Sequence, residues 1–274
     1  FSKLVAHAAH IYINTNEHYR AKAETQTRED RFIEWCKAEF SKHNYQKSNP
    51  ILQQLRSIKA DEEIKQISRA CAITEKGFRR VLEFVQPGVW EYEIEAEFAH
   101  EFLRNRSKGF AYTPIIASGN NSNVLHYIEN NKQCQAGALI LMDIGAEYGN
   151  YSSDMTRTVP VSGKFTKRQR AVYDAVLHVK NSATQLLAPG ILWKAYHIEV
   201  GKLMSSALVD LTLLSKKDIA KNPNAYKKYF MHGTSHHLGL DTHDYGLLDE
   251  PMQANMVFTV EPGIYIPDEV LVFV

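Results

Sequence analysis

Apolar residues recur at steps of three and four positions in several long stretches of the chain. This spacing places them on one face of a helix, so each stretch is expected to be helical and to pack that face into the core. Pro-Gly pairs follow two of the stretches and mark helix ends. The expected helices extend from Lys59 to the residues before Pro87, from about Glu91 to Arg104, from Thr166 to Leu187 and from Leu192 to Leu214.

Continuous apolar runs predict buried strands. Residues 139–142 form such a run between two glycines, and residues 156–161 form a second β-prone run. Residues 147–150, which lie between the two runs, have the composition of a turn. Strands that carry the polar motifs, with helices outside them, predict an α+β fold.

The position of this turn decides how two aspartates are placed. If it is centred on Tyr148 and Gly149, Asp143 lies directly opposite Asp154, with the Cβ atoms roughly 4.5–5.5 Å apart. If it is centred on Gly149 and Asn150, the register shifts unless a bulge restores it. Like charges at that separation repel, so we expect a positive group between them. Two solvated carboxylates at a turn are the alternative.

Residues 1–55 are expected to form a part separate from residues 56–274. They are predicted to contain a strand at His10–Ile13 and a helix around Arg31–Phe40, followed by a polar linker at His43–Pro50. A segment of this length is short for an independent hydrophobic core.

Composition excludes several functions. The 274 residues are 44% hydrophobic, enough for a sizeable core. Lys and Arg total 32 and Asp and Glu total 31, so the chain has no net field for nucleic acid or an anionic membrane. No apolar stretch approaches the roughly 20 residues of a membrane span, and no basic-then-apolar leader opens the chain. The three cysteines are widely spaced, as in a reducing compartment, so a cytoplasmic enzyme is expected.

A histidine-rich block suggests metal chemistry. Four histidines lie close together: His232, His236, His237 and His243. With the two aspartates and a glutamate in FTVEPGIYI (Glu261), each on a β-like apolar run, they form a ligand set for a hard or borderline divalent cation. Glycines in the block argue against a regular helix, and there is no HExxH motif. We interpret His237 as structural or exposed.

Four segments, in this order, resemble aminopeptidase P, the Xaa-Pro aminopeptidases of the pita-bread metallopeptidase family. They are VLHYIENN, MDIGAEYGNYSSDMTRTVPVSGKFT, HGTSHHLGLDTHD and VEPGIY. The resemblance extends from about Arg56 to Pro267. It implies a pita-bread catalytic domain over residues 56–274, with a curved antiparallel sheet and outer helices. The last portion of an N-terminal α/β domain would precede it at residues 1–55.

The resemblance also implies a role for each candidate residue. Asp143 would bind one metal ion, and Asp154 would bridge two. His236 and Glu261 would bind the second ion. The remaining catalytic groups, which would face the substrate or surround the ligands, are His126, His232 and His243.

The implied chemistry is hydrolysis. Two divalent ions roughly 3.5–4 Å apart can hold a bridging hydroxide and polarise a carbonyl. Oxygen-rich ligation with one imidazole favours Mn²⁺, with Zn²⁺ or Co²⁺ as alternatives. The expected enzyme is a dinuclear metallo-aminopeptidase acting on peptides with proline in the second position. A prolidase-like Xaa-Pro dipeptidase, or a metal-free, non-catalytic binding module on the same scaffold, are alternatives. Family members are commonly oligomers, which leaves a homo-oligomer open.

The family takes a fifth ligand, a bridging glutamate, from a later strand with an IRIED-like sequence. This chain instead reads IPDEVLVFV after Tyr265. Three carboxylate ligands are few for two divalent ions. We therefore expect the catalytic domain to be incomplete, with a segment missing between Glu269 and Val270 and their Cα atoms farther apart than about 3.8 Å.

Overall fold

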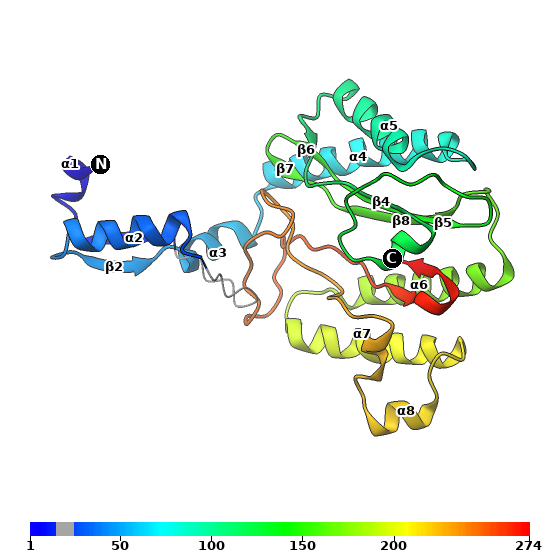
Figure 1. Cartoon of the computed structure of the whole chain (residues 1–274). Helices are drawn as coiled ribbons and strands as arrows, with labels where there is room; N and C mark the ends of the chain where they lie inside the picture. The colour runs from blue at the N-terminus through cyan, green and yellow to red at the C-terminus, as the bar shows by residue number, and fades with distance from the viewer. Residues whose placement is uncertain (15–24) are drawn as a thin grey trace. The chain divides into compact units, whose positions relative to one another are not determined.

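The chain divides into two units, Phe1–Arg56 and Ser57–Val274, in a computed structural model that describes residues 1–14 and 25–274 (Figure 1). The elements of the first unit are α1 (Ser2–Val5), β1 (His10–Ile13), α2 (Arg28–Glu39), β2 (Asn44–Lys47) and α3 (Asn49–Ser57). The expected strand at His10–Ile13 is confirmed, and it pairs in parallel with β2. Helix α2 begins earlier than expected because Thr27 and Asp30 form a capping box. The origin of this unit as the end of a larger domain stays a prediction.

The second unit mixes helices and short strands. Its helices are α4 (Asp61–Phe84), α5 (Glu91–Arg104), α6 (Lys167–Leu186), α7 (Trp193–Asp210) and α8 (Lys216–Lys221), with 3-10 turns η1 (Gly119–Asn123), η2 (Ala225–Lys228) and η3 (Pro267–Glu269). Its strands are β3 (Gly109–Phe110), β4 (Ile115–Ser118), β5 (Leu139–Ile144), β6 (Ala146–Tyr148), β7 (Tyr151–Ser152), β8 (Met155–Pro160), β9 (Ile264–Ile266) and β10 (Leu271–Phe273). Among the described residues, no helix has both the length and the apolar character of a membrane span.

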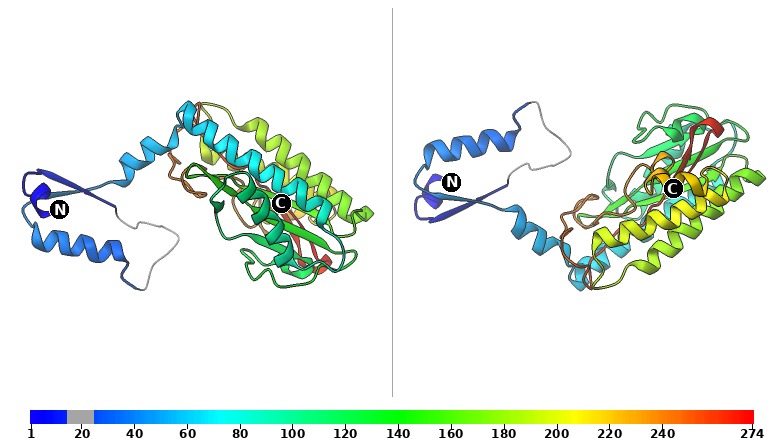
Figure 2. Two further views of the ribbon diagram at one scale, coloured as in Figure 1. Left: turned by 90° about the horizontal axis from the view of Figure 1, so that it is seen from above. Right: turned by 90° about the horizontal axis from the view of Figure 1, so that it is seen from below.

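Helices cover both sides of the strands. Figure 1 shows α4 and α5 on one side and α6 and α7 on the other, and Figure 2 shows α6 and α7 side by side. Two hydrophobic clusters match this layering. One joins Phe98 to Met142, and the other joins Val179 and Met204 to Phe273. The apolar helix faces are thus core, as the spacing predicted.

The four long helices of this unit are confirmed, with one boundary corrected. Helix α7 ends at Asp210 and not at Leu214. Thr212 adopts a φ of +61°, and the amides of Leu213 and Leu214 donate back to the carbonyl of Leu208. This left-handed residue satisfies the carbonyls at the helix end and stops the helix.

The central antiparallel sheet has the order β4-β5-β8, and its hairpin has the second of the two expected registers. Asp143 pairs with Thr156, and the inner strands pair Tyr148 with Tyr151. The turn is therefore centred on Gly149 and Asn150, and Asp143 does not lie directly opposite Asp154. Both turn residues have positive φ, which a tight hairpin turn requires and which Gly and Asn tolerate.

Glu269 and Val270 are joined in the 3-10 turn η3, so the expected wide separation of their Cα atoms is not seen. A segment missing from the given sequence stays a prediction. The Val270 amide donates to the Pro267 carbonyl at 3.1 Å, and β10 pairs antiparallel with β9. This short connection holds Val270 at a φ of +53°, an unfavourable conformation for a β-branched residue. The carboxylate of Glu269 pairs with Arg168 on α6.

Gly145 allows a close backbone approach at the base of the hairpin. A Cβ atom at this position would collide with the carbonyl of Ser153 and contact the ring of Tyr112. The Ser153 hydroxyl lies 2.7 Å from the hydroxyl of Thr74 on α4, which accepts the Ala146 amide. This buried network holds the chain in place immediately before Asp154.

We expect Gly145→Ala to lower the free energy of unfolding by about 1–3 kcal/mol, because overpacking forces a backbone shift. Urea unfolding measures the change. Gly233→Ala is the matched control, since its added Cβ would lie 4.0 Å from its nearest neighbour, the carbonyl oxygen of Ser235. Equal stability of the two variants would contradict this reading of Gly145.

Candidate metal centre

Three side chains from distant segments converge in the second unit. The Nε2 atom of His236 lies 3.3 Å from Oδ2 of Asp154 and 3.0 Å from Oε1 of Glu261. One ligand atom from each of the three residues lies within 4.8 Å of the others. Two carboxylates and an imidazole at this separation can bind one divalent cation.

Asp143 joins this group through Tyr112. The Tyr112 hydroxyl lies 2.6 Å from Oδ1 of Asp143 and 3.1 Å from Oδ1 of Asp154, and it donates toward both carboxylates. The two acids therefore converge although their backbones are not paired. A positive group was expected between the two acids, and the Tyr112 hydroxyl is found there instead. Tyr112 lies in the loop before β4 and belongs to no motif, so the sequence did not indicate it.

The cluster carries more negative charge than the protein neutralises. Burial raises the pKa of Asp143 from its ordinary value of 3.8, and the charge of Asp154 raises it further, to about 7. The hydrogen bond from Tyr112 acts in the opposite direction and does not compensate. A bound cation would relieve this repulsion, so the residues fit a metal ion.

His236 is oriented for ligation. Burial alone would lower its pKa, but hydrogen bonds to Asp154 and Glu261 outweigh burial and raise it to about 10. Its Nδ1 atom donates to the carbonyl of His237 at 2.9 Å. This bond fixes the tautomer in which Nε2 carries the lone pair when the ring is neutral, and Nε2 is the atom that faces the carboxylates.

Backbone pairing brings His236 and Glu261 together without a regular strand. The Thr259 amide donates to the His236 carbonyl, and the Glu261 amide donates to the Thr234 carbonyl. The Thr259 hydroxyl accepts from the His236 amide and donates to Oε1 of Glu261 at 2.8 Å. Of the four expected ligands only Asp143 lies within a strand. The expectation that every ligand lies on a β strand is therefore wrong for Asp154, His236 and Glu261. The sequence also gave no indication that Thr259 supports Glu261.

Two further histidines lie near the cluster. The ring of His243 is 4.4 Å from that of His236, centroid to centroid, and nearly perpendicular to it. Burial lowers the pKa of His243, and the neighbouring His236 lowers it further. His126 acts on the same pKa in the same direction, which places it within electrostatic reach of His243.

A fully buried glutamate holds the loop that carries His126. Glu91 accepts hydrogen bonds from the amide and hydroxyl of Ser118, from the hydroxyl of Tyr127 and from the amide of Lys132. His126 itself has a φ of +58°. From the sequence, Glu91 is only the start of a helix, since the loop that its carboxylate holds lies far along the chain.

The other two histidines of the block differ in their surroundings. His232 contacts the Gly233 carbonyl through Nδ1 and the Tyr265 hydroxyl through Nε2, at 2.8 Å and 3.1 Å. His237 is buried, stacks on Trp193 and has a pKa lowered to about 4, chiefly by burial. The interpretation of His237 as structural agrees with this packing.

A family model described as metallopeptidase family M24 matches residues 65–274. The chain belongs to metallopeptidase family M24. Relatives include Xaa-Pro aminopeptidases of Haemophilus influenzae and Escherichia coli, 40% and 42% identical over 80% of this chain. Xaa-Pro aminopeptidase 3 of Homo sapiens is 36% identical over 84% of it. The chain spans about half the length of these relatives, namely 52%, 51% and 46%.

Solved structures of aminopeptidase P share the fold of this chain. Aminopeptidase P from E. coli in a low-pH form has a TM-score of 0.83 and 35% identity, covering 95% of this chain and 60% of that chain. Proline aminopeptidase P II from Yersinia pestis has a TM-score of 0.82 and 36% identity, covering 95% and 61%. The resemblance to aminopeptidase P and the α+β pita-bread fold are thus confirmed for this M24 chain.

The raised pKa of Asp143 predicts a pH effect on stability in metal-free buffer. The folded chain keeps this proton to a higher pH than the unfolded chain. The stability that the proton contributes is therefore present below about pH 4 and is lost as the pH rises to about 7. Asp143→Asn stays neutral, so it should gain stability relative to the parent chain across this window, by a few kcal/mol.

Urea unfolding in a chelating buffer at several pH values measures this difference. Asp174→Asn on the exposed surface of α6 removes one carboxylate outside the cluster and is the control. It should show no gain in stability, because Asp174 pairs with Arg170. A parallel pH dependence of Asp143→Asn and the parent chain would contradict the repulsion assigned to the cluster.

Proposed function

We propose that this chain carries the catalytic unit of a metal-dependent aminopeptidase that releases an N-terminal residue preceding proline. One observation carries the proposal: Asp154, His236 and Glu261 converge, with Asp143 attached through Tyr112. The relatives described as Xaa-Pro aminopeptidases support the substrate class. Such an enzyme needs a cation site open to a peptide, and the three convergent side chains are each partly exposed.

The residues present fit two divalent cations. Asp154 lies between two groups, with one oxygen toward Tyr112 and Asp143 and the other toward His236. This position supports a bridging role, with Asp143 on one ion and His236 and Glu261 on the other. Carboxylate oxygens outnumber imidazole nitrogens in this set, which favours Mn²⁺ over Zn²⁺ or Co²⁺. When bound, the ions would supply an activated water molecule at neutral pH and polarise the scissile carbonyl.

The histidines would act on the substrate. The lowered pKa of His243 keeps the imidazole neutral at neutral pH, so its N–H can donate a hydrogen bond where negative charge develops on the carbonyl oxygen. His126, on the loop held by Glu91, would hold the peptide or relay a proton. His232, placed by Tyr265, would line the approach to the acids.

A prolidase-like dipeptidase and a metal-free binding module remain the alternatives. Both would keep the same scaffold, and substrate length depends on the walls of the cleft more than on the ligands. Similarity to relatives described as Xaa-Pro aminopeptidases favours the aminopeptidase over the dipeptidase. Repulsion between Asp143 and Asp154 favours a site that binds metal over a metal-free module. A cytoplasmic location stays a prediction, supported by three cysteines that are all free thiols.

Metal removal should abolish hydrolysis of Xaa-Pro peptides, and Mn²⁺ should restore it. The assay compares Xaa-Pro dipeptides, longer Xaa-Pro peptides and matched peptides with alanine in the second position, with metal content measured by elemental analysis. Longer Xaa-Pro peptides should be cleaved best. Cleavage of dipeptides alone would indicate a prolidase-like enzyme, and full activity in a demetallated sample would exclude the proposal.

Two histidine variants separate ligation from substrate contact. His236→Ala should lose bound metal together with activity. His243→Ala should keep its metal and lower kcat by about 10²–10³-fold, the effect of losing one hydrogen bond to a developing oxyanion. Metal stoichiometry and kcat are measured on both, with His178→Ala on the exposed face of α6 as the control. The reverse pattern would exchange the two roles.

A further inference from the structure

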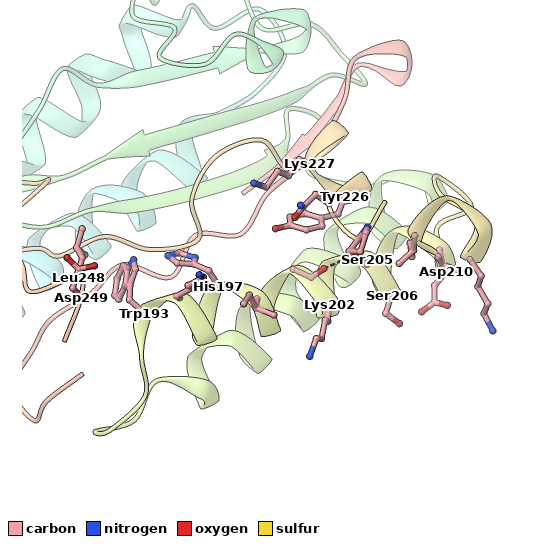
Figure 3. A pocket seen from close by; sticks show the side chains of 18 residues that line it. Trp193, His197, Lys202, Ser205, Ser206, Asp210, Tyr226, Lys227, Leu248 and Asp249 are labelled. Carbon is pink, nitrogen blue, oxygen red and sulfur yellow. Dashed lines mark hydrogen bonds between the residues drawn. The ribbon is translucent and has the colours of Figure 1, made fainter. Parts of the chain in front are cut away.

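A groove of about 950 Å³ follows the outer face of α7. Its lining includes Gly201 and Ser205 of the helix, and Tyr226 of η2 lies across from them. Figure 3 shows Trp193 at one end and Asp210 at the other. Of the described residues that line the groove, none is a candidate metal ligand or catalytic histidine. The groove is therefore a surface separate from the acid cluster.

Lysines surround this groove. Residues 193–228 carry seven lysines against three acids, whereas the whole chain has a net charge of only +1. The lining contains four lysines against two aspartates, Asp210 and Asp249. Within residues 1–14 and 25–274, Lys194, Lys216 and Lys227 form no ion pair. Ile198, also in the lining, is 51% exposed. The surface thus combines an apolar lining with a positive rim, which suits an apolar segment flanked by acids.

Helix α5 presents a surface of that kind. Tyr92 and Leu103 are 52% and 63% exposed, and at 100° per residue they share one face with the exposed Ala96. Residues 91–104 carry five glutamates and one arginine. Glu93 and Glu95 lie about 80° to either side of the middle of this stripe. Neither is paired with a lysine or arginine in the part of the chain that the structure describes. The helix therefore leaves an apolar stripe with acidic flanks open to solvent.

We propose that α5 of one copy of the chain docks into the α7 groove of a second copy. The stripe from Tyr92 to Leu103 is roughly 16 Å long and the groove from Trp193 to Val209 roughly 24 Å, at about 1.5 Å per helical residue. The stripe therefore fits within the groove. Figure 1 shows α5 and α7 on opposite sides of the second unit, so the two surfaces of one molecule do not meet. The contact is a helix-in-groove contact between copies.

This geometry has two consequences. The two partners contribute different surfaces, so the contact is head-to-tail and each copy keeps one free surface for another copy. Opposite charges at the rim make association weaken as salt rises. One helix in one groove also buries less surface than an obligate interface, so association is reversible and depends on concentration.

Sedimentation velocity of the purified chain tests the contact, at low salt and at about 0.5 M salt. The parent chain should associate as concentration rises to about 100 µM, and about tenfold more weakly at high salt. The groove variant is Lys216→Glu with Lys227→Glu, and the helix variant is Ala96→Lys with Leu103→Lys. Each should weaken association at least about tenfold. Circular dichroism checks that both are folded.

Matched controls carry the same charge changes outside the two surfaces. Lys164→Glu with Lys180→Glu controls for the groove variant, and Ala171→Lys with Leu177→Lys, on the exposed face of α6, controls for the helix variant. Both controls should associate like the parent chain. If a control loses association as fully as its partner variant, overall charge and not the contact is responsible, and the proposal is overturned.

Mixing the two defective variants gives the sharpest test. The groove variant keeps an intact α5 and the helix variant keeps an intact groove. An equimolar mixture should therefore form one-to-one pairs and nothing larger, although each variant alone stays monomeric. A monomeric parent chain, variants that associate like the parent, or a mixture that stays monomeric would each overturn the proposal.

Discussion

Electrostatic repulsion among three carboxylates is the constraint on which the arrangement of the candidate site depends. Asp143, Asp154 and Glu261 meet in a partly buried place, where burial and mutual charge raise the pKa of Asp143 to about 7. Two groups of the protein offset part of this repulsion, namely the Tyr112 hydroxyl and the protonated ring of His236. These groups neutralise less charge than a divalent cation would, so a bound cation would reduce the repulsion further.

The surrounding structure keeps these acids together by close backbone approaches and buried polar contacts. Gly145 lets the strand pass against Ser153, and the hydroxyl pair of Thr74 and Ser153 ties that point to helix α4. Thr259 connects the backbone of His236 to the carboxylate of Glu261. The acids are thus held by helix α4, by the hairpin at Gly145 and Ser153, and by the loop of Thr259. A shift in any of these segments would move one of the candidate ligands.

The outer helices have a different role. Their inner faces fill the two hydrophobic clusters, as their three- and four-residue spacing predicted. The remaining faces carry opposite charge, acidic on α5 and basic around α7. Since the acid cluster lies among the strands and loops, charge on these outer faces can serve contacts between molecules without changing the ligands.

The sequence by itself determined the long helices, the two main strands, the α+β class and the residue types of the candidate metal centre, because these follow from local periodicity and from four ordered motifs. It left the hairpin register open, and the pairing of Asp143 with Thr156 and of Tyr148 with Tyr151 in the folded hairpin decided it. Only the tertiary structure decided that Tyr112 joins the two aspartates, that Thr259 orients Glu261 and that Glu91 holds the loop of His126. Tyr112 and Glu91 contact groups far away along the chain, while Thr259 depends on two loops that pair without a strand. Neither hydrophobic periodicity nor a short sequence motif can predict contacts of this kind.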